Sequence, residues 1–231
     1  MGDVTVRTWD WSKDEADIRA FRDGIKVWGK QHFRAFPWRK TTDPYLLLIA
    51  EVMLHRTQVI QVVPVYEKFV ARYPDLFHFA GADREELKFL LKPLGLHWRI
   101  DLIYEMALAL AAGFGSKMPK EKSDLLSLPG VSEYIASAVR CFAWNIPEAL
   151  VDTNTIRIIG RVSGWPVKDS SRRNRRFTQA LANLVDPFEP RSYNYGLLDL
   201  AHLVCLKKQA PLCNQCPLIS MCQMGQSIRA S

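Results

Sequence analysis

The sequence predicts an all-α protein. Apolar residues recur at helical spacing over segments of about a dozen residues, whereas apolar–polar alternation over strand-like lengths is scarce. Turn-forming residues separate these segments, as at Tyr73-Pro74-Asp75 and Leu128-Pro129-Gly130. The chain has no internal period and no low-complexity tract, so we expect packed helices and not a solenoid.

The candidate helices follow one another with few residues between them. In chain order they span residues 18–33, 45–53, 59–73, 84–91, 99–112, 134–144, 156–164, 177–185 and 195–204. Each has apolar residues at helical spacing and therefore one face suited to a core. Breaks coincide with Pro37, Pro44, Pro74, Pro93 and Pro147. Proline ends helices because it lacks an amide hydrogen and restricts the residue before it.

Length and composition limit the class of protein. With 231 residues, the chain can form one large domain or two smaller ones. No window approaches the roughly eighteen consecutive apolar residues of a membrane span. The opening Met1-Gly2-Asp3-Val4 lacks a basic-then-apolar signal. We therefore expect a prokaryotic-type intracellular protein of the cytoplasm, with no membrane association and with reduced thiols.

The net charge of +7 and an isoelectric point near 9.2 indicate a polyanionic partner or simply a soluble basic protein. Charge alone favours these two interpretations equally. Basic residues cluster in Arg172-Arg173-Asn174-Arg175-Arg176 and Lys207-Lys208, which favours phosphate contacts. The first cluster also fits a solvated helix face.

The cysteines carry the most specific signal. Cys205, Cys213, Cys216 and Cys222 are separated by seven, two and five residues. Thiolates at such spacing can converge on an iron–sulfur cluster or zinc, whereas a disulfide framework fits a chain of this length poorly. Zinc sites usually pair two short Cys-x2-Cys motifs, so this pattern favours a [4Fe-4S] cluster. The remaining Cys141 lies in an apolar run and is interpreted as a buried small hydrophobe.

A tight turn between two apolar helices is the second signal. One helix closes with Asp124-Leu125-Leu126-Ser127, and the next opens at Glu133. Between them, Gly130, Val131 and Ser132 form a turn in which glycine lets the backbone approach a ligand. The amides at the start of the second helix favour a phosphate there. This pattern predicts a helix-hairpin-helix that holds a DNA backbone, although any αα-hairpin can look alike in isolation.

The hairpin, Val151-Asp152-Thr153-Asn154 and the four cysteines occur in an order that resembles the helix-hairpin-helix DNA glycosylases with an iron–sulfur cluster, the HhH-GPD superfamily. Within that superfamily, the chain is most similar to the mismatch thymine/uracil glycosylases and the MutY-type adenine glycosylases. The resemblance runs from Phe36-Pro37-Trp38-Arg39 through Glu51-Val52-Met53-Leu54 to Cys222.

The resemblance implies two helical domains flanking a DNA cleft. A six-helix barrel with the hairpin would occupy residues 36–146, and residues 1–35 and 147–231 would form the cluster-bearing domain. It also implies a [4Fe-4S] cluster, a monomeric, nucleoid-associated protein, and double-stranded DNA with a mismatch or damaged base as partner.

Asp152 matches the catalytic aspartate of this family. Cleavage of an N-glycosidic bond develops positive charge on the sugar, which a fixed carboxylate stabilises while it orients or deprotonates water. Local sequence alone favours a helix N-cap at this position.

Tyr134 occupies the position where bifunctional members have a lysine nucleophile. A phenol cannot form a Schiff base, so the resemblance implies a hydrolytic glycosylase without strand cleavage. Asn154 fits both monofunctional groups and is predicted to contact DNA.

Glu51 matches a glutamate of both monofunctional groups, where it handles water or the departing base. The alternative interpretation is an ordinary polar residue on an amphipathic helix.

His55 and Arg56 stand where thymine mismatch enzymes have basic residues and MutY-type enzymes usually have glutamines. Arg56 resembles the residue that fills the gap left by a flipped base and bonds the orphaned guanine, and Leu96 resembles an opposing apolar wedge. Both also fit ordinary packing or a phosphate contact.

The sequence departs from the family pattern at three points. Ser132 replaces a usual glycine, the first cysteine gap has seven residues where six are usual, and the chain ends nine residues after Cys222. The last point disfavours an adenine glycosylase, whose MutY-type members carry a further lesion-reading domain.

The expected function is therefore base excision repair: a hydrolase that flips thymine or uracil out of a mispair with guanine and removes it. A MutY-like adenine glycosylase acting on A·G or A·oxidised-guanine pairs is the alternative. A catalytically silent DNA-binding module is disfavoured because Glu51, Tyr134 and Asp152 occur together.

Overall fold

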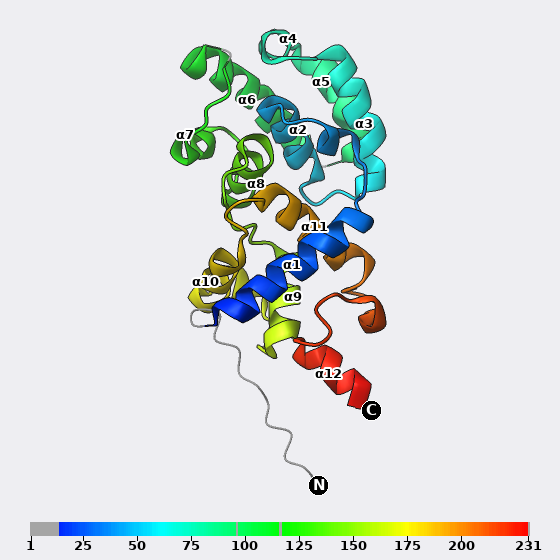
Figure 1. Cartoon of the computed structure of the whole chain (residues 1–231). Helices are drawn as coiled ribbons and strands as arrows, with labels where there is room; N and C mark the ends of the chain where they lie inside the picture. Colours follow the sequence, from blue (N-terminus) through cyan, green and yellow to red (C-terminus); the bar gives the residue numbers. More distant parts are fainter. Residues whose placement is uncertain (1–13, 96, 116, 231) are drawn as a thin grey trace. The chain divides into compact units, whose positions relative to one another are not determined.

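A computed structural model describes residues 14–95, 97–115 and 117–230 of the chain, which form helices joined by turns and loops (Figure 1). The described residues include no β-strand. The prediction of an all-α protein is therefore confirmed. No helix among them is long and apolar enough to cross a membrane.

The helices have the following bounds. The α-helices are α1 (Glu15–Gln31), α2 (Pro44–Leu54), α3 (Val59–Arg72), α4 (Leu76–Ala80), α5 (Arg84–Leu91), α6 (His97–Phe114), α7 (Lys122–Ser127), α8 (Glu133–Trp144), α9 (Thr153–Ser163), α10 (Arg175–Leu184), α11 (Pro190–Leu203) and α12 (Gln223–Ala230). The short 3-10 helices are η1 (Pro37–Lys40), η2 (Lys92–Leu94), η3 (Asp169–Arg173) and η4 (Cys213–Gln215).

Every candidate helix of the sequence is present, but several begin earlier than expected. The helix predicted from residue 18 starts at Glu15, because Asp14 caps it by accepting a hydrogen bond from the amide of Asp17 at 3.2 Å. Caps are polar and carry no apolar periodicity, so the periodic signal starts after them. The short α4 and α12 were not predicted; the five residues of α4 hold too few apolar repeats to be recognised.

Contacts between Cα atoms divide the chain into two compact units. The first contains the described parts of Met1–Arg34 and Ile146–Ser231, and the second spans Ala35–Asn145. Each unit has its own apolar core. The first core is built by α1, α9, α10 and α11, and the second by α2 to α8.

The second unit is organised around α2. Every residue from Leu47 to Met53 is buried, because the sequence is apolar on almost every face of the helix. The helix starts sharply, since Asp43 accepts hydrogen bonds from the next two amides and Pro44 occupies the first turn. Both α3 and α8 pack against it. A helix that is apolar all round belongs inside a core, and α2 lies there.

The first unit depends on a close crossing of α1 and α11 at two glycines. A Cβ atom on Gly29 would lie 2.8 Å from the Cα of Gly196, and one on Gly196 would lie 2.8 Å from the backbone oxygen of Ile25. These contacts are backbone contacts and cannot be relieved by turning a side chain. The two helices can therefore approach this closely only because both positions are glycine.

We predict that Gly196→Ala lowers the free energy of unfolding by about 1–3 kcal/mol, because the added methyl group forces α1 and α11 apart. Gly113→Ala is the matched control, since a Cβ there meets no atom within 4 Å and α6 gains helix propensity. Chemical denaturation monitored by circular dichroism measures both. Equal stability of the two variants would contradict the account of the crossing.

Candidate functional site

The predicted hairpin is present between α7 and α8. The amide of Val131 donates to the carbonyl of Leu128 at 3.2 Å, and Gly130 has a φ of +78°, a conformation that favours glycine. Ser132 has a φ of −91° and caps α8, since its Oγ accepts from the amide of Ile135 at 3.3 Å. No second glycine is needed at Ser132, because its backbone is extended. Gly130 and Ser132 are exposed and Val131 is half-buried, so the turn is open to a ligand.

Glu51 and Tyr134 lie on two helices that pack together in the second unit. Glu51 is on the buried α2 with only 6 % of its surface exposed, and Tyr134 is half-buried in the first turn of α8. Carboxylates are almost never buried to this extent unless they are paired. The interpretation of Glu51 as an ordinary polar residue on an amphipathic helix is therefore wrong, because α2 is buried almost all round.

The turn after α2 carries His55 and Arg56. Both side chains are exposed, and Arg56 has a φ of +60°, which is uncommon for a residue with a side chain. Partial burial lowers the pKa of His55, and the charges of Arg56 and Arg99 lower it further. His55 therefore tends to be neutral, and the positive charge of the turn resides on Arg56. Leu96, the predicted wedge, lies outside the described residues.

Asp152 lies in the first unit and caps α9. Its Oδ1 accepts from the amides of Asn154 and Thr155, both at 2.8 Å, and its Oδ2 accepts from the side-chain amide of Asn154 at 2.7 Å. The Oγ1 of Thr155 accepts in return from the Asp152 amide at 3.0 Å and completes a capping box. The cap predicted from local sequence is thus present. Three hydrogen bonds leave the half-buried carboxylate capacity for one more partner.

Asn154 connects this cap to a residue that the sequence did not predict. Its Oδ1 accepts from Nη1 of Arg157 at 3.1 Å, while Nε of Arg157 donates to the carbonyl of Cys205 at 2.9 Å and Nη2 donates to that of Ala201 at 2.8 Å. Both polar ends of the Asn154 side chain are thus engaged. Its predicted contact with DNA stays a prediction.

Arg161, one turn further along α9, contacts the cysteine segment directly. Its Nη1 donates to Sγ of Cys205 at 3.1 Å and to the carbonyl of Leu206 at 2.8 Å, and its own carbonyl accepts from Sγ of Cys222 at 3.4 Å. Asn154, Arg157 and Arg161 recur at helical spacing, which is the sequence signal that could have identified them as one face.

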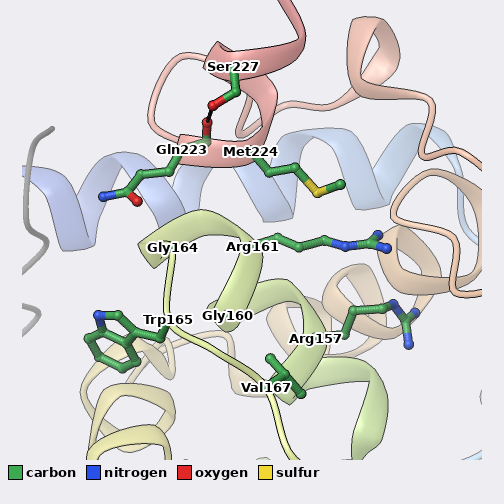
Figure 2. A pocket seen from close by; sticks show the side chains of 9 residues that line it. All are labelled: Arg157, Gly160, Arg161, Gly164, Trp165, Val167, Gln223, Met224 and Ser227. Carbon is green, nitrogen blue, oxygen red and sulfur yellow. Dashed lines mark hydrogen bonds between the residues drawn. The ribbon is translucent and has the colours of Figure 1, made fainter. Parts of the chain in front are cut away.

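The two arginines also line a surface pocket of about 530 Å³ between α9 and α12. Figure 2 shows both side chains extending from α9 in the same direction, with Met224 of α12 above them. The pocket is an open depression beside the cysteine segment.

The four C-terminal cysteines lie at or near helix ends. Cys205 follows α11, Cys213 begins η4, Cys216 directly follows η4, and Cys222 immediately precedes α12. None forms a disulfide. Burial raises the pKa of Cys213, Cys216 and Cys222, that of Cys216 to about 12, and repulsion from the neighbouring cysteines contributes to each shift.

These thiols do not converge as ligands of a single ion. Within the described part of the chain, no group of three or more His, Cys, Asp or Glu side chains is placed to hold one metal ion. A tetrahedral zinc site needs four donors around one centre. In a four-iron cluster each thiolate binds a different iron, so the sulfurs stand farther apart. Four thiolates are a donor set that suits such a cluster.

Comparison with known proteins places these features in context. Residues 49–183 match the family model described as "HhH-GPD superfamily base excision DNA repair protein". The chain is 38 % identical over 216 residues to a "Thymine-DNA glycosylase" of Aeropyrum pernix, a match that covers 90 % of this chain and 96 % of the relative. It is 39 % identical to a "Thymine/uracil-DNA glycosylase" of Pyrobaculum aerophilum, covering 87 % and 90 %.

Two further matches are informative. The "Adenine DNA glycosylase" of Homo sapiens is 32 % identical across 97 % of this chain, but the match covers only 43 % of that protein. The solved structure of a thermostable thymine-DNA glycosylase superposes with a TM-score of 0.82 at 29 % identity, covering 91 % of this chain and 97 % of the other.

The capping box makes a prediction about stability. Thr155 is fully buried, and its hydroxyl donates to the carbonyl of Leu150 at 2.8 Å and accepts from the Asp152 amide. We predict that Thr155→Val lowers the free energy of unfolding by about 1–3 kcal/mol, because the isosteric change removes the partner of the buried Leu150 carbonyl and that of the half-buried Asp152 amide. Thr153→Val, at an exposed position of the same turn, should have little effect. Thermal unfolding of both variants checks this, and equal melting temperatures would contradict it.

Proposed function

Because the chain belongs to the HhH-GPD superfamily of base excision DNA repair proteins, we propose that it is a monofunctional DNA glycosylase that removes thymine or uracil mispaired with guanine. The main support for this substrate class is the similarity to relatives named thymine- or thymine/uracil-DNA glycosylases. The match extends over about nine-tenths or more of the length of these relatives. The match to adenine glycosylases is less similar and covers less than half of the human protein. Excision of adenine is the second candidate function.

The proposed reaction begins when the target nucleotide leaves the stack. Extrusion of a mispaired base requires less energy than extrusion of a paired one, which favours mismatches. The exposed hairpin turn at Gly130, Val131 and Ser132 would hold the DNA backbone without reading sequence. Arg56, exposed and not ion-paired with any described carboxylate, would enter the gap and donate to the acceptors of the orphaned guanine.

Asp152 would act on the sugar. As the C1′–N bond breaks, its electron pair leaves with the base and positive charge develops on the sugar, which the carboxylate stabilises. Water then adds to C1′, and the proton that it loses neutralises the departing base anion. The capping box fixes the orientation of the carboxylate, and its remaining acceptor capacity suits that water or the sugar.

Glu51 and Tyr134 would complete the site. A carboxyl group buried in the apolar α2 is suited to hold water or the departing base by hydrogen bonds. Tyr134 supplies no amine, so no Schiff base forms at this position and the strand stays intact.

This function is tested with duplexes that contain single T·G, U·G, A·G or A·oxidised-guanine pairs. We predict that the protein releases thymine and uracil, that the strand breaks only after alkali, and that borohydride traps no covalent complex. Asp152→Asn preserves the cap, so it should still bind the T·G duplex while single-turnover excision falls by about a hundredfold or more. Adenine release without pyrimidine release would establish the alternative. Borohydride trapping would refute the monofunctional assignment.

We further propose that Cys205, Cys213, Cys216 and Cys222 hold a [4Fe-4S] cluster. The four free thiols and their spacing along the chain support it. When bound, the cluster cross-links the segment after α11 to α12. The hydrogen bond from Arg161 to Sγ of Cys205 would stabilise a thiolate ligand, because the donor is charged.

The cluster makes a separate prediction. Purified protein should be yellow-brown and contain iron, and Cys213→Ser should lose the colour, the iron and part of its thermal stability. Cys141→Ala is the control, since Cys141 is buried in α8 outside the set and its change should leave the iron content unchanged. Stoichiometric zinc without iron would refute the cluster.

A further inference from the structure

Arg99 is a buried guanidinium in the first turn of α6, with 3 % of its surface exposed. Its Nη1 donates to the carbonyl of Met53 at 2.7 Å and to Oγ1 of Thr57 at 3.0 Å, and its Nη2 donates to the carbonyl of His55. All three acceptors belong to the end of α2 and the turn that follows. One side chain of α6 therefore binds both flanks of Arg56.

The charge of Arg99 is balanced by this turn and not by a carboxylate. No described Asp or Glu forms an ion pair with it, and its buried Nε has no hydrogen-bond partner among the described residues. The last turn of α2 contains no basic residue of its own. Arg99 therefore supplies, from another helix, the cation that the negative end of the α2 dipole favours. Arginine retains its charge when buried, so the interaction persists.

The turn requires such a restraint. Arg56 has a φ of +60°, and the left-handed region is unfavourable for residues that carry a Cβ. Residues persist in such conformations only where the surrounding structure over-determines them. The amide of Thr57 donates to the carbonyl of Leu54 at 3.2 Å, which closes the turn but does not fix its orientation on the rest of the unit. The hydrogen bonds from Arg99 connect the turn to α6.

We propose that Arg99 is a positioning residue that holds the His55–Thr57 turn in the conformation from which Arg56 reaches the DNA gap. The proposal rests on the proposed function only for the role of Arg56 in DNA. Arg99 itself is buried and touches no substrate. Its removal changes mismatch recognition because the exposed Arg56 side chain is then presented from a mobile turn.

The first test is a double-mutant cycle in the Asp152→Asn background, which prevents turnover. We measure the affinity for a T·G duplex relative to a fully paired duplex of the same length. Arg56→Ala and Arg99→Met should each reduce this preference by about tenfold, and the double variant should be no worse than Arg56→Ala alone. A double variant that loses the product of the two single effects would overturn the proposal, because Arg99 would then act independently of Arg56.

The second test needs no DNA. Trypsin cleaves after arginine, so cleavage at the Arg56–Thr57 bond of the native protein reports how firmly the turn is held. In Arg99→Met this cleavage should accelerate by about tenfold relative to cleavage elsewhere in the chain. Arg84→Met is the matched control, because Arg84 of α5 is exposed and pairs at 2.6 Å with Asp101 of α6, the helix that carries Arg99. It should leave the cleavage rate at Arg56 unchanged.

Two milder variants keep the test decisive if Arg99→Met does not fold. Arg99→Lys retains the cation, but its single ammonium group cannot span the three acceptors. Thr57→Val removes one acceptor alone. Both should show accelerated cleavage at Arg56, and an unchanged rate in both would overturn the proposal. If the parent protein shows no mismatch preference, the proposed function fails, and the trypsin result still decides the role of Arg99.

Discussion

The burial of α2 is the constraint on which the second unit depends. The helix is apolar on all sides, so its neighbours α3 and α8 must pack against it, and every polar group that it carries is held in a fixed place. Glu51 is the one acidic residue of the helix, and its burial follows from that of its neighbours. The end of α2 is fixed in a similar way, because its last carbonyls need donors and Arg99 provides the donor for the carbonyl of Met53.

A corresponding arrangement organises the first unit around α9. Asp152 begins the helix, and the side chains of Asn154, Arg157 and Arg161 continue from it toward Cys205. A continuous set of hydrogen bonds thus joins the candidate catalytic carboxylate to the candidate cluster ligands. Because Arg157 and Arg161 bind backbone carbonyls as well as side chains, the conformation of the cysteine segment and that of α9 are mutually dependent.

The sequence predicted the helices well and the polar contacts poorly. Apolar periodicity identified each long helix, and α5 matches its predicted range of 84–91. Periodicity reports which residues face a core, so it cannot identify Arg99, whose three acceptors lie more than forty positions earlier in the chain. Arg157 was missed for the same reason, since its partners include Ala201 and Cys205. Interactions between distant segments depend on tertiary structure, which local patterns do not encode.

The two interpretations of Asp152 do not compete. Local sequence favoured an N-cap, and the family resemblance favoured a catalytic group; the structure contains the cap. A carboxylate that caps a helix is restrained by backbone amides, and such restraint is what electrostatic stabilisation of a charged transition state requires, because the group need not reorganise during the reaction. The Asp152 carboxylate has room for both roles, because the cap and Asn154 use three of its roughly four lone-pair positions. A structural requirement of α9 therefore supplies the preorganisation that the proposed chemistry needs.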